Sequence, residues 1–304
     1  MTKPSPIFEK LKTRLPQAVV RHDEPLSKRT TLRVGGCAEV YVEPSSEEDL
    51  VQVLQTCREE SVSWMVLGRG SNLLIRDGGV SGVVICLAHP VFSGITVKDC
   101  ELRCGAGAKL KAVAAKAREA SLGGLEFLEG IPGGVGGALR MNAGAMGSAT
   151  FEFVTQARFM DASGQVWERD IAQVPVEYRS CPLFKTNIAL AATFRGRPDS
   201  TESIVERSNA LNQKRWKSQP KESSAGCIFK NPTPTVPAGK LIDELGLKGT
   251  RRGGAAVSEV HGNFIVNEGS ATAADVLELI DFIKARAKAE RGIELREEVE
   301  IIGQ

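Results

Sequence analysis

Two glycine-rich loops are the segments of this 304-residue sequence best suited to hold a phosphorylated ligand. The first reads Gly-Arg-Gly-Ser-Asn over residues 68–72, and the second carries five glycines within Gly130–Gly137. Glycine lets a backbone approach a pyrophosphate closely, and successive N–H groups can form an anion-binding nest. Ser71 and Asn72 add side chains that can form hydrogen bonds. We therefore expect both loops to contact a pyrophosphate.

Neither loop matches a standard nucleotide motif. No Gly-Lys-Ser/Thr follows them, and neither fits the G-x-G-x-x-G fingerprint with its later ribose-binding acid. A simple tight turn remains an alternative for the first loop. The second loop is harder to explain as a turn, because five glycines in eight residues are costly in backbone entropy.

The cysteines and histidines do not predict a metal site. The sequence has seven scattered cysteines and only three histidines, without two pairs at zinc-site spacing. We expect mostly free thiols, as in a cytosolic protein.

The composition is that of an ordinary globular protein, with 42% hydrophobic and 25% charged residues. A net charge of +2 gives no support for a nucleic-acid or membrane partner attracted by bulk charge. The N-terminal residues do not resemble a signal peptide, and no stretch approaches the ~20 apolar residues of a membrane span. We expect a cytoplasmic protein.

The elements that must position the loops alternate between strand and helix patterns. Ala38–Glu43 is typical of a strand, and Ser45 with Glu48 predicts a capping box that starts the next helix. Trp64–Leu67 predicts a short buried strand that leads into the first glycine loop.

Further along the chain, the pattern predicts a helix that glycines stop, a mostly β segment, two more helices and a final strand. These elements are Lys109–Ser121, Phe153–Phe194, Thr201–Trp216, Thr272–Gly292 and Glu298–Ile302. The expected fold is α+β with three subdomains, residues 1–95, 96–205 and 206–304.

Seven stretches in order along almost the whole chain resemble the UDP-N-acetylenolpyruvoylglucosamine reductase family. They are TTLRVGG at Thr30–Gly36, LGRGSNLL at Leu67–Leu74, GLEFLEGIPGGVGGALRMNAGAMG at Gly124–Gly147, EYR at Glu177–Arg179, SAGCIFKNP at Ser224–Pro232, AGKLIDELGLKG at Ala238–Gly249 and LREEV at Leu295–Val299. No single stretch is decisive, but seven in family order make coincidence implausible.

The resemblance implies a fold and a reaction. Two subdomains would form an FAD-binding unit of the vanillyl-alcohol-oxidase/PCMH type, and the third would bind substrate. FAD would be noncovalent, because the first loop lacks the histidine that attaches FAD in some relatives. NADPH would donate electrons to reduce UDP-N-acetylglucosamine enolpyruvate to UDP-N-acetylmuramate. The compact C-terminal third resembles the shorter form of the family, without its tyrosine-loop insertion.

Three catalytic residues follow from the resemblance. Arg179 is similar to the family's stabiliser of carboxylate charge, because a guanidinium fork suits a planar carboxylate. Cys227 stands where many members have the serine that protonates the substrate carbon, and a thiol can also donate a proton. Glu298 matches the catalytic glutamate of the family. Glu297 is the neighbour that a shift of one residue in the alignment would select. Because side chains alternate between the two faces of a strand, only one of the two can point to the active site.

The resemblance also assigns binding residues. For FAD, the candidates are the two loops together with Arg33 and Asn142: Arg33, Gly68, Arg69, Gly70, Ser71, Asn72, Gly133, Gly134, Val135, Gly136, Gly137 and Asn142. For the substrate they are Tyr178, Arg215, Lys217, Lys230 and Asn231. The sequence does not decide which of Arg215 and Lys217 holds the diphosphate, and Arg33 and Asn142 could instead only shape their loops. No separate NADPH motif is present, and the family implies that NADPH enters the same cleft.

Two alternatives remain at this point. The chain could be another flavin oxidoreductase on the same fold, although Cys227, Asn231 and Glu298 together belong to the reductase pattern. It could also be a nucleotide-sugar binding protein without catalysis, which would purify colourless. For the reductase we expect a monomer with no nucleic-acid partner and no membrane insertion.

Overall fold

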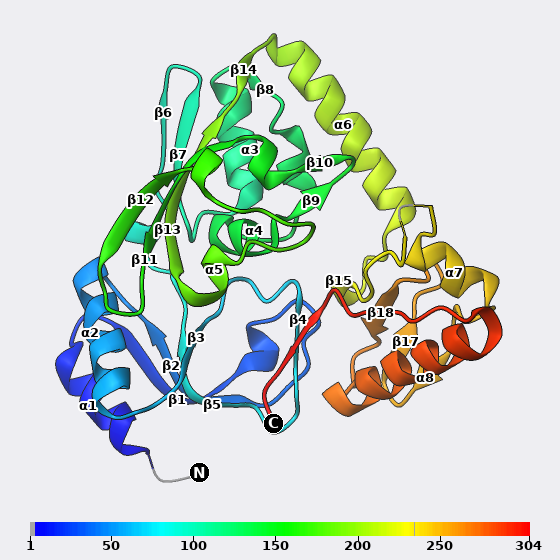
Figure 1. Ribbon diagram of the computed structural model, residues 1–304, viewed down its shortest axis with the longest axis horizontal. Coiled ribbons are helices and arrows are strands. Elements are labelled where there is room, and N and C mark those ends of the chain that lie inside the picture. The colour runs from blue at the N-terminus through cyan, green and yellow to red at the C-terminus, as the bar shows by residue number, and fades with distance from the viewer. Residues whose placement is uncertain (1–3, 234) are drawn as a thin grey trace. The chain divides into compact units, whose positions relative to one another are not determined.

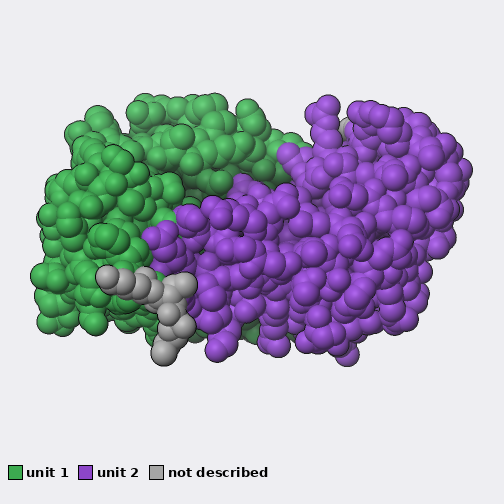
Figure 2. All heavy atoms as spheres, turned by 90° about the horizontal axis from the view of Figure 1, so that it is seen from below, with its two compact units in different colours: residues 1–22, 40–69, 82–215 green, residues 23–39, 70–81, 216–304 purple. Residues whose placement is uncertain are grey.

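The computed structural model describes residues 4–233 and 235–304. The chain forms two compact units, and it passes between them several times. Unit 1 holds the described residues up to 22 together with 40–69 and 82–215, and unit 2 holds 23–39, 70–81 and 216–304 (Figure 2). This clustering leaves the three-subdomain division of the sequence as a prediction.

The first sheet has the strand order β1-β2-β5-β3. Its strands are β1 (Val19–Pro25), β2 (Cys37–Glu43), β5 (Val80–Ile85) and β3 (Trp64–Val66). Helices α1 (Pro6–Arg14) and α2 (Glu47–Glu59) pack on each other. Strand β3 pairs with β5 in parallel and leads into the first glycine loop, which begins two residues after β3.

The second sheet lies wholly in unit 1 and has the order β12-β11-β13-β7-β6. Its strands are β12 (Val166–Asp170), β11 (Val154–Met160), β13 (Ile188–Arg195), β7 (Glu101–Gly105) and β6 (Ile95–Lys98), and all its pairs are antiparallel. Helices α3 (Leu110–Glu119) and α4 (Val135–Met141) contact this sheet, and α5 (Leu183–Thr186) contacts α4.

Short elements complete unit 1. The two-residue strands are β8 (Leu122–Gly123) with β14 (Arg197–Pro198), and β9 (Gly144–Ala145) with β10 (Ser148–Ala149). Four 3-10 helices are described in it: η2 (Pro90–Phe92), η3 (Glu126–Gly130), η4 (Thr150–Glu152) and η5 (Ile171–Gln173).

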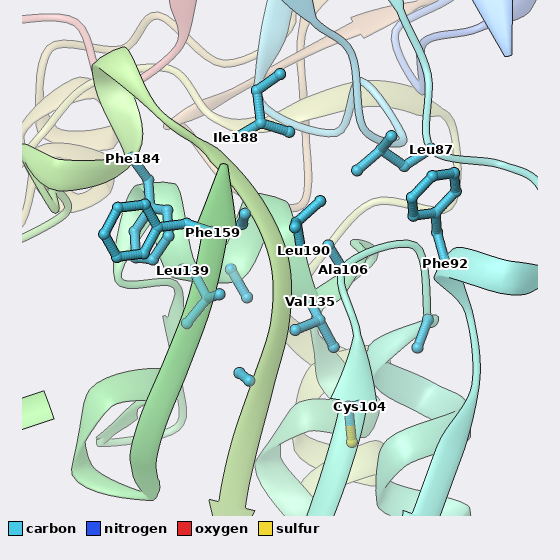
Figure 3. Packing of buried hydrophobic residues seen from close by; sticks show 14 of the residues in the cluster. Leu87, Phe92, Cys104, Ala106, Val135, Leu139, Phe159, Phe184, Ile188 and Leu190 are labelled. Atoms are coloured by element: carbon cyan, nitrogen blue, oxygen red, sulfur yellow. The ribbon is translucent and has the colours of Figure 1, made fainter. Parts of the chain in front are cut away.

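The core of unit 1 seats the helix that carries the second glycine loop. Val135 and Leu139 of α4 are fully buried, in the same hydrophobic cluster as Leu190 of β13 and Ala106, which follows β7 (Figure 3). Beside them, the rings of Phe159 and Phe184 meet edge to face with centroids 6.2 Å apart. Burying a side chain such as Val or Leu contributes about 1.5–3 kcal/mol, so this core fixes where α4 begins.

Unit 2 has its own sheet and its own core. The sheet order is β15-β18-β17-β16, from β15 (Ser223–Cys227), β18 (Phe264–Asn267), β17 (Ala255–Val257) and β16 (Arg251–Arg252). The other elements are η1 (Leu26–Lys28), β4 (Leu73–Ile75) parallel to β19 (Glu300–Ile302), α7 (Ala238–Glu244) and α8 (Ala273–Arg291). Figure 1 shows α8 lying along β17. Helix α6 (Thr201–Ser218) contains the boundary between the units, at Arg215.

Helix α8 shows why the sequence predicted it well. Thr272 accepts a hydrogen bond from the Asp275 N–H and Asp275 accepts one from the Thr272 N–H, at 3.1 and 2.9 Å. At the other end, Gly292 has φ +65°, the left-handed conformation that favours glycine. The N-terminus of α8 is also capped by a residue distant in the sequence. The Asp77 carboxylate accepts hydrogen bonds from the N–H groups of Ala273 and Ala274, both at 2.9 Å.

Three local expectations were wrong by one or two residues. The cap of α2 is Ser46, whose hydroxyl accepts the Asp49 N–H at 3.1 Å, and not Ser45 with Glu48. Helix α3 ends at Glu119, before the glycine pair, and Ser121 has φ +55°. The final strand starts at Glu300, because the N–H groups of the two residues before it both point to the carbonyl of Ile228.

The segment between β12 and β13 is also not strand. It holds η5, a tight turn and α5, and it includes Pro175 and Pro182, which cannot donate to a sheet. The α+β class itself is confirmed by the mixture of helices with mainly antiparallel sheets. No helix among the described residues is long and apolar enough to cross a membrane.

Candidate active site

Three of the sequence motifs meet in unit 2. The Thr31 hydroxyl donates to the Ser224 carbonyl at 2.7 Å, and the Thr31 N–H donates to the Gly70 carbonyl at 3.3 Å. Gly70 has φ +60°, and a Cβ there would lie 2.7 Å from the Cα of Thr30. Only glycine allows this approach. The first motif, the first glycine loop and the segment that carries Cys227 therefore form one packed group.

Asn72 ties the last motif to the same group. Its side-chain amide donates to the Glu298 carbonyl at 3.0 Å, and its own carbonyl accepts the Glu300 N–H at 3.0 Å. Asn72 is thus a positioning residue for the segment that carries Glu298. Its contact with FAD stays a prediction.

Cys227 and Glu298 come from adjacent backbone segments. The Glu298 N–H donates to the carbonyl of Ile228, the residue after Cys227, at 2.7 Å. Cys227 ends β15 opposite Phe264 and is half-buried, and the preceding Gly226 has φ +77°. The structure therefore brings together two of the three predicted catalytic residues, which are 71 positions apart in the sequence.

Glu297, the neighbour of Glu298, forms an ion pair with a lysine of α8. The Glu297 carboxylate accepts a hydrogen bond from Lys284 of α8 at 2.7 Å. Burial acts to raise the pKa of Glu297, but the hydrogen bonds from Lys284 and from a backbone N–H outweigh it and lower that pKa. Glu297 therefore serves as the ionised partner of Lys284, which favours Glu298 as the catalytic candidate.

Arg179 lies in a tight turn of unit 1. The turn is closed by the Glu177 N–H, which donates to the Ser180 carbonyl at 2.9 Å, and Arg179 has φ +55°. This left-handed conformation is unfavourable for a long side chain. The guanidinium stands 5.3 Å from the ring centroid of Tyr178, which is 61% exposed.

The Arg179 side chain turns back over the loop after α4. Its Nη1 atom would lie 2.9 Å from a Cβ on Gly144. Asn142 connects the two segments: its amide donates to the Glu177 carbonyl at 3.3 Å, and its oxygen accepts the Phe151 N–H at 3.2 Å. Asn142 therefore shapes the loop that holds Arg179, and a contact with FAD stays a prediction.

Some N–H groups of the second glycine loop donate hydrogen bonds to carbonyls of the protein itself. Val135 and Gly136 donate to the carbonyls of Ala108 and Ala106, at 3.0 and 2.8 Å, and Gly133 donates to Ile131 at 2.8 Å. These groups are engaged within the unit, so the loop is not a simple nest whose N–H groups all point to a ligand.

Two glycines have no structural reason to be glycine. A Cβ on Gly68 or on Gly137 would meet no atom within 4 Å, and neither residue has a positive φ. Both are exposed, as is Arg69, whereas Ser71 is half-buried. Open space at a glycine allows a ligand to approach the backbone closely. These positions fit the proposed contact with a pyrophosphate.

The remaining predicted residues are spread over both units. Arg33 is exposed in unit 2 with φ +60°, and its N–H donates to the Thr30 hydroxyl at 3.3 Å. Lys217 is exposed in unit 2 near the end of α6. Arg215 is half-buried in unit 1, with a side-chain carbon 3.9 Å from a Cβ on Gly130, and burial lowers the pKa of its guanidinium.

The last two substrate candidates, Lys230 and Asn231, lie in the segment before α7. The Asn231 oxygen accepts the Ala238 N–H at 3.0 Å, which caps the N-terminus of that helix. The Lys230 N–H donates to the Arg296 carbonyl at 2.9 Å. One backbone bond and one side-chain bond thus anchor this segment, and such anchoring suits residues that must orient a ligand.

Two positioning residues were not among those predicted. Thr31 lies within a recognised motif, so the motif was the available signal. Asn263 gave no signal, yet its buried amide donates to the Phe229 carbonyl at 2.8 Å and accepts the Phe229 N–H at 2.9 Å. Among the described residues, no group of three or more His, Cys, Asp or Glu side chains could hold a metal ion.

Comparisons with known proteins show which family the chain resembles over its length. Residues 219–302 match a family described as UDP-N-acetylenolpyruvoylglucosamine reductase, C-terminal domain, and residues 38–169 match one described as FAD binding domain. The chain is 43% identical over 300 residues to the UDP-N-acetylenolpyruvoylglucosamine reductase of Nitrobacter hamburgensis, with 98% of each chain covered. It is 41% identical over 287 residues to that of Clostridioides difficile, with 94% of each covered.

A solved structure extends the similarity to three dimensions. The crystal structure of the UDP-N-acetylenolpyruvylglucosamine reductase from Thermus caldophilus superimposes with a TM-score of 0.81 at 36% identity, over 94% of this chain and 99% of that one. Because the sequence and structural similarities both run over nearly the whole length, the chain belongs to the UDP-N-acetylenolpyruvoylglucosamine reductase family.

Proposed function

We propose roles for individual side chains in the reaction of this family. The chain is an FAD-dependent oxidoreductase that uses NADPH to reduce UDP-N-acetylglucosamine enolpyruvate to UDP-N-acetylmuramate during peptidoglycan precursor synthesis. The observation that carries the roles is the hydrogen bond from Glu298 to Ile228, which holds Cys227 and Glu298 on neighbouring segments.

The residues fit FAD at the two glycine loops. Gly68 and Gly137 leave open the space that a Cβ would fill. Gly68–Asn72 and Gly133–Gly137 would hold the pyrophosphate, and Arg33 and Asn142 would lie nearer the ring system or the ribose. When bound, FAD supplies the hydride that it has received from NADPH.

Arg179 stabilises the substrate carboxylate. Negative charge grows there as hydride adds to the vinyl carbon, and a guanidinium fork binds a planar carboxylate with two parallel hydrogen bonds. Its left-handed backbone supports this role, because a residue held in such a conformation without need is often functional.

Cys227 donates the proton that completes the reduction. Its Sγ–H transfers a proton to the substrate carbon next to the one that accepts hydride, and a thiol is a stronger acid than the alcohol of the usual serine. Glu298 polarises the enol system or orients the donor. The residues that bind the UDP-sugar are Tyr178, Arg215, Lys217, Lys230 and Asn231. Arg215 or Lys217 holds its diphosphate.

We also propose that residues 1–95 and 96–205 bind FAD and that 206–304 bind the substrate. A cytoplasmic location and a monomeric state complete the proposal, since the many thiols suit a reducing compartment. The net charge of +2 supports neither a nucleic-acid nor a membrane partner.

The reaction is tested by the visible spectrum of the purified protein without oxygen. A yellow protein should bleach with NADPH and recover its colour only when UDP-N-acetylglucosamine enolpyruvate is added. A flavin that bleaches but ignores the sugar would point to another flavin oxidoreductase. A colourless protein that FAD cannot reconstitute would contradict the flavoenzyme assignment.

A further inference from the structure

Trp216 is a large aromatic side chain that the fold does not use. It lies in the last turn of α6 and is 61% exposed. Within residues 4–233 and 235–304, its indole makes no hydrogen bond and no ring contact with another described residue. A largely exposed tryptophan gains little stability from burial, and its indole face is open to a ligand.

Trp216 does not lie on the face of α6 that packs against the protein core. Ile204 and Ser208 are buried, and Leu211 packs against the core of unit 1. These positions are three or four residues apart and share one face. Trp216 lies five residues beyond Leu211, which is ~140° further round the helix. The regular spacing of the helix therefore places Trp216 on its solvent-exposed side, and no local distortion is needed to explain its exposure.

The surroundings of Trp216 are basic and not apolar. Lys217 follows it directly, and Lys221 is exposed a few residues later in the same unit. The other exposed large apolar residue of α6, Val205, lies about 16 Å away along the helix axis. Asn209 and Asn212 lie on the same face between them. A protein-docking surface would need a contiguous apolar patch, which this face lacks.

An isolated indole beside ammonium groups matches the chemistry of a nucleotide. The indole can stack on a base, and a lysine can pair with a phosphate as a point charge. We propose that Trp216 is the stacking surface for the base of a nucleotide that this enzyme binds. The inference rests on the proposed function, in which Arg215 or Lys217, the two neighbours of Trp216, contacts a diphosphate. The base is either the uracil of the UDP-sugar or the adenine of NADPH.

The test measures nucleotide binding to the FAD-loaded enzyme by calorimetry, with UDP and NADP⁺ titrated separately. We compare the wild type with W216A, W216F and V205A, the last being a matched control on the same helix face. Loss of one stacked base should weaken binding of one nucleotide by about 5- to 100-fold in W216A. W216F should remain within a few-fold of wild type, because a phenyl ring still stacks, and V205A should be unchanged.

The nucleotide that weakens identifies the base. An effect on UDP alone assigns Trp216 to the uracil, and an effect on NADP⁺ alone assigns it to the adenine. In turnover, the matching KM should rise while kcat stays near wild type, which a general loss of structure would not produce.

Two results would overturn the inference and leave the proposed function intact: W216A that binds both nucleotides as the wild type does, or V205A that weakens binding equally. A wild-type enzyme that binds neither nucleotide would instead remove the proposed function, and the inference with it.

Discussion

At the scale of single residues, Cys227 separates the two halves of the reaction. Proton donation is needed only when the sugar is reduced, so C227A should still bleach with NADPH. Reoxidation of the reduced enzyme by UDP-N-acetylglucosamine enolpyruvate should slow by about 10²–10⁴-fold. Stopped-flow absorbance without oxygen measures both steps.

The serine variant is the control for Cys227. C227S restores the residue that many family members carry, so it should keep substantial turnover. If C227A slowed bleaching and reoxidation equally, Cys227 would be a structural residue and not a proton donor.

Arg179 offers a second test because its backbone conformation suits glycine better than arginine. R179G should keep the free energy of unfolding within about 1 kcal/mol of wild type, or raise it, since glycine adopts φ +55° without strain. R179K keeps the charge but not the fork. Both variants should lose kcat, by about 10²–10³-fold, with little change in FAD affinity.

Urea unfolding, bound-flavin content and steady-state turnover together measure these effects. An R179G enzyme that purified without FAD, or that unfolded far more easily, would show that Arg179 supports the fold and not the reaction.

At the scale of elements, the start of α8 depends on a residue nearly two hundred positions away. Asp77 satisfies two N–H groups that the helix itself cannot pair, and its charge complements the helix dipole. D77A should therefore lower the free energy of unfolding by about 1–3 kcal/mol. D281N, an exposed position on the same helix, should change it by less than about 0.5 kcal/mol. Urea denaturation followed by circular dichroism compares the two.

The hairpin between β11 and β12 gives a pH-dependent case. Hydrogen bonds from Ser163 and Trp167 lower the pKa of Asp161 from 3.8 to about 2. A carboxyl whose pKa is lower in the folded state stabilises it above the unfolded pKa. That contribution is lost as the pH falls through the folded pKa.

D161N should therefore be less stable than wild type at pH 7, by on the order of 1 kcal/mol after allowance for solvent screening. The difference should shrink between pH 4 and pH 2, and Trp167 fluorescence is a local probe because its indole donates to Asp161 at 2.9 Å. A difference that stays constant over this range would show that the carboxylate charge is not the cause.

At the scale of the whole molecule, the cofactor and the fold are thermodynamically linked. FAD that binds only the native state stabilises the chain by about 2.7 kcal/mol at a hundredfold excess over Kd. A Cβ on Gly137 meets no atom within 4 Å. G137V should therefore leave the apoprotein within about 1 kcal/mol of wild type but remove most of the FAD-dependent rise in Tm. Thermal denaturation with and without FAD tests this, and an unchanged rise would exclude Gly137 from the cofactor site.

Local sequence patterns were sufficient for much of this protein. Helix α8 was predicted from its own periodicity over Thr272–Gly292, and the structure shows the Thr272 cap and the left-handed Gly292 at its two ends. The seven motifs were sufficient for the family and hence for the reaction. Where the pattern was ambiguous locally, as at the start of α2, the prediction missed by one residue.

Only the tertiary structure decided which polar groups remain for a ligand. Val135 donates to Ala108 and not to a phosphate, and Glu297 pairs with Lys284, because the fold brings these distant residues together. The sequence determined the chemical groups of the site and the elements that carry them. Their availability was decided by the fold, because each hydrogen bond made across long sequence separations removes a donor or an acceptor that the sequence alone leaves open.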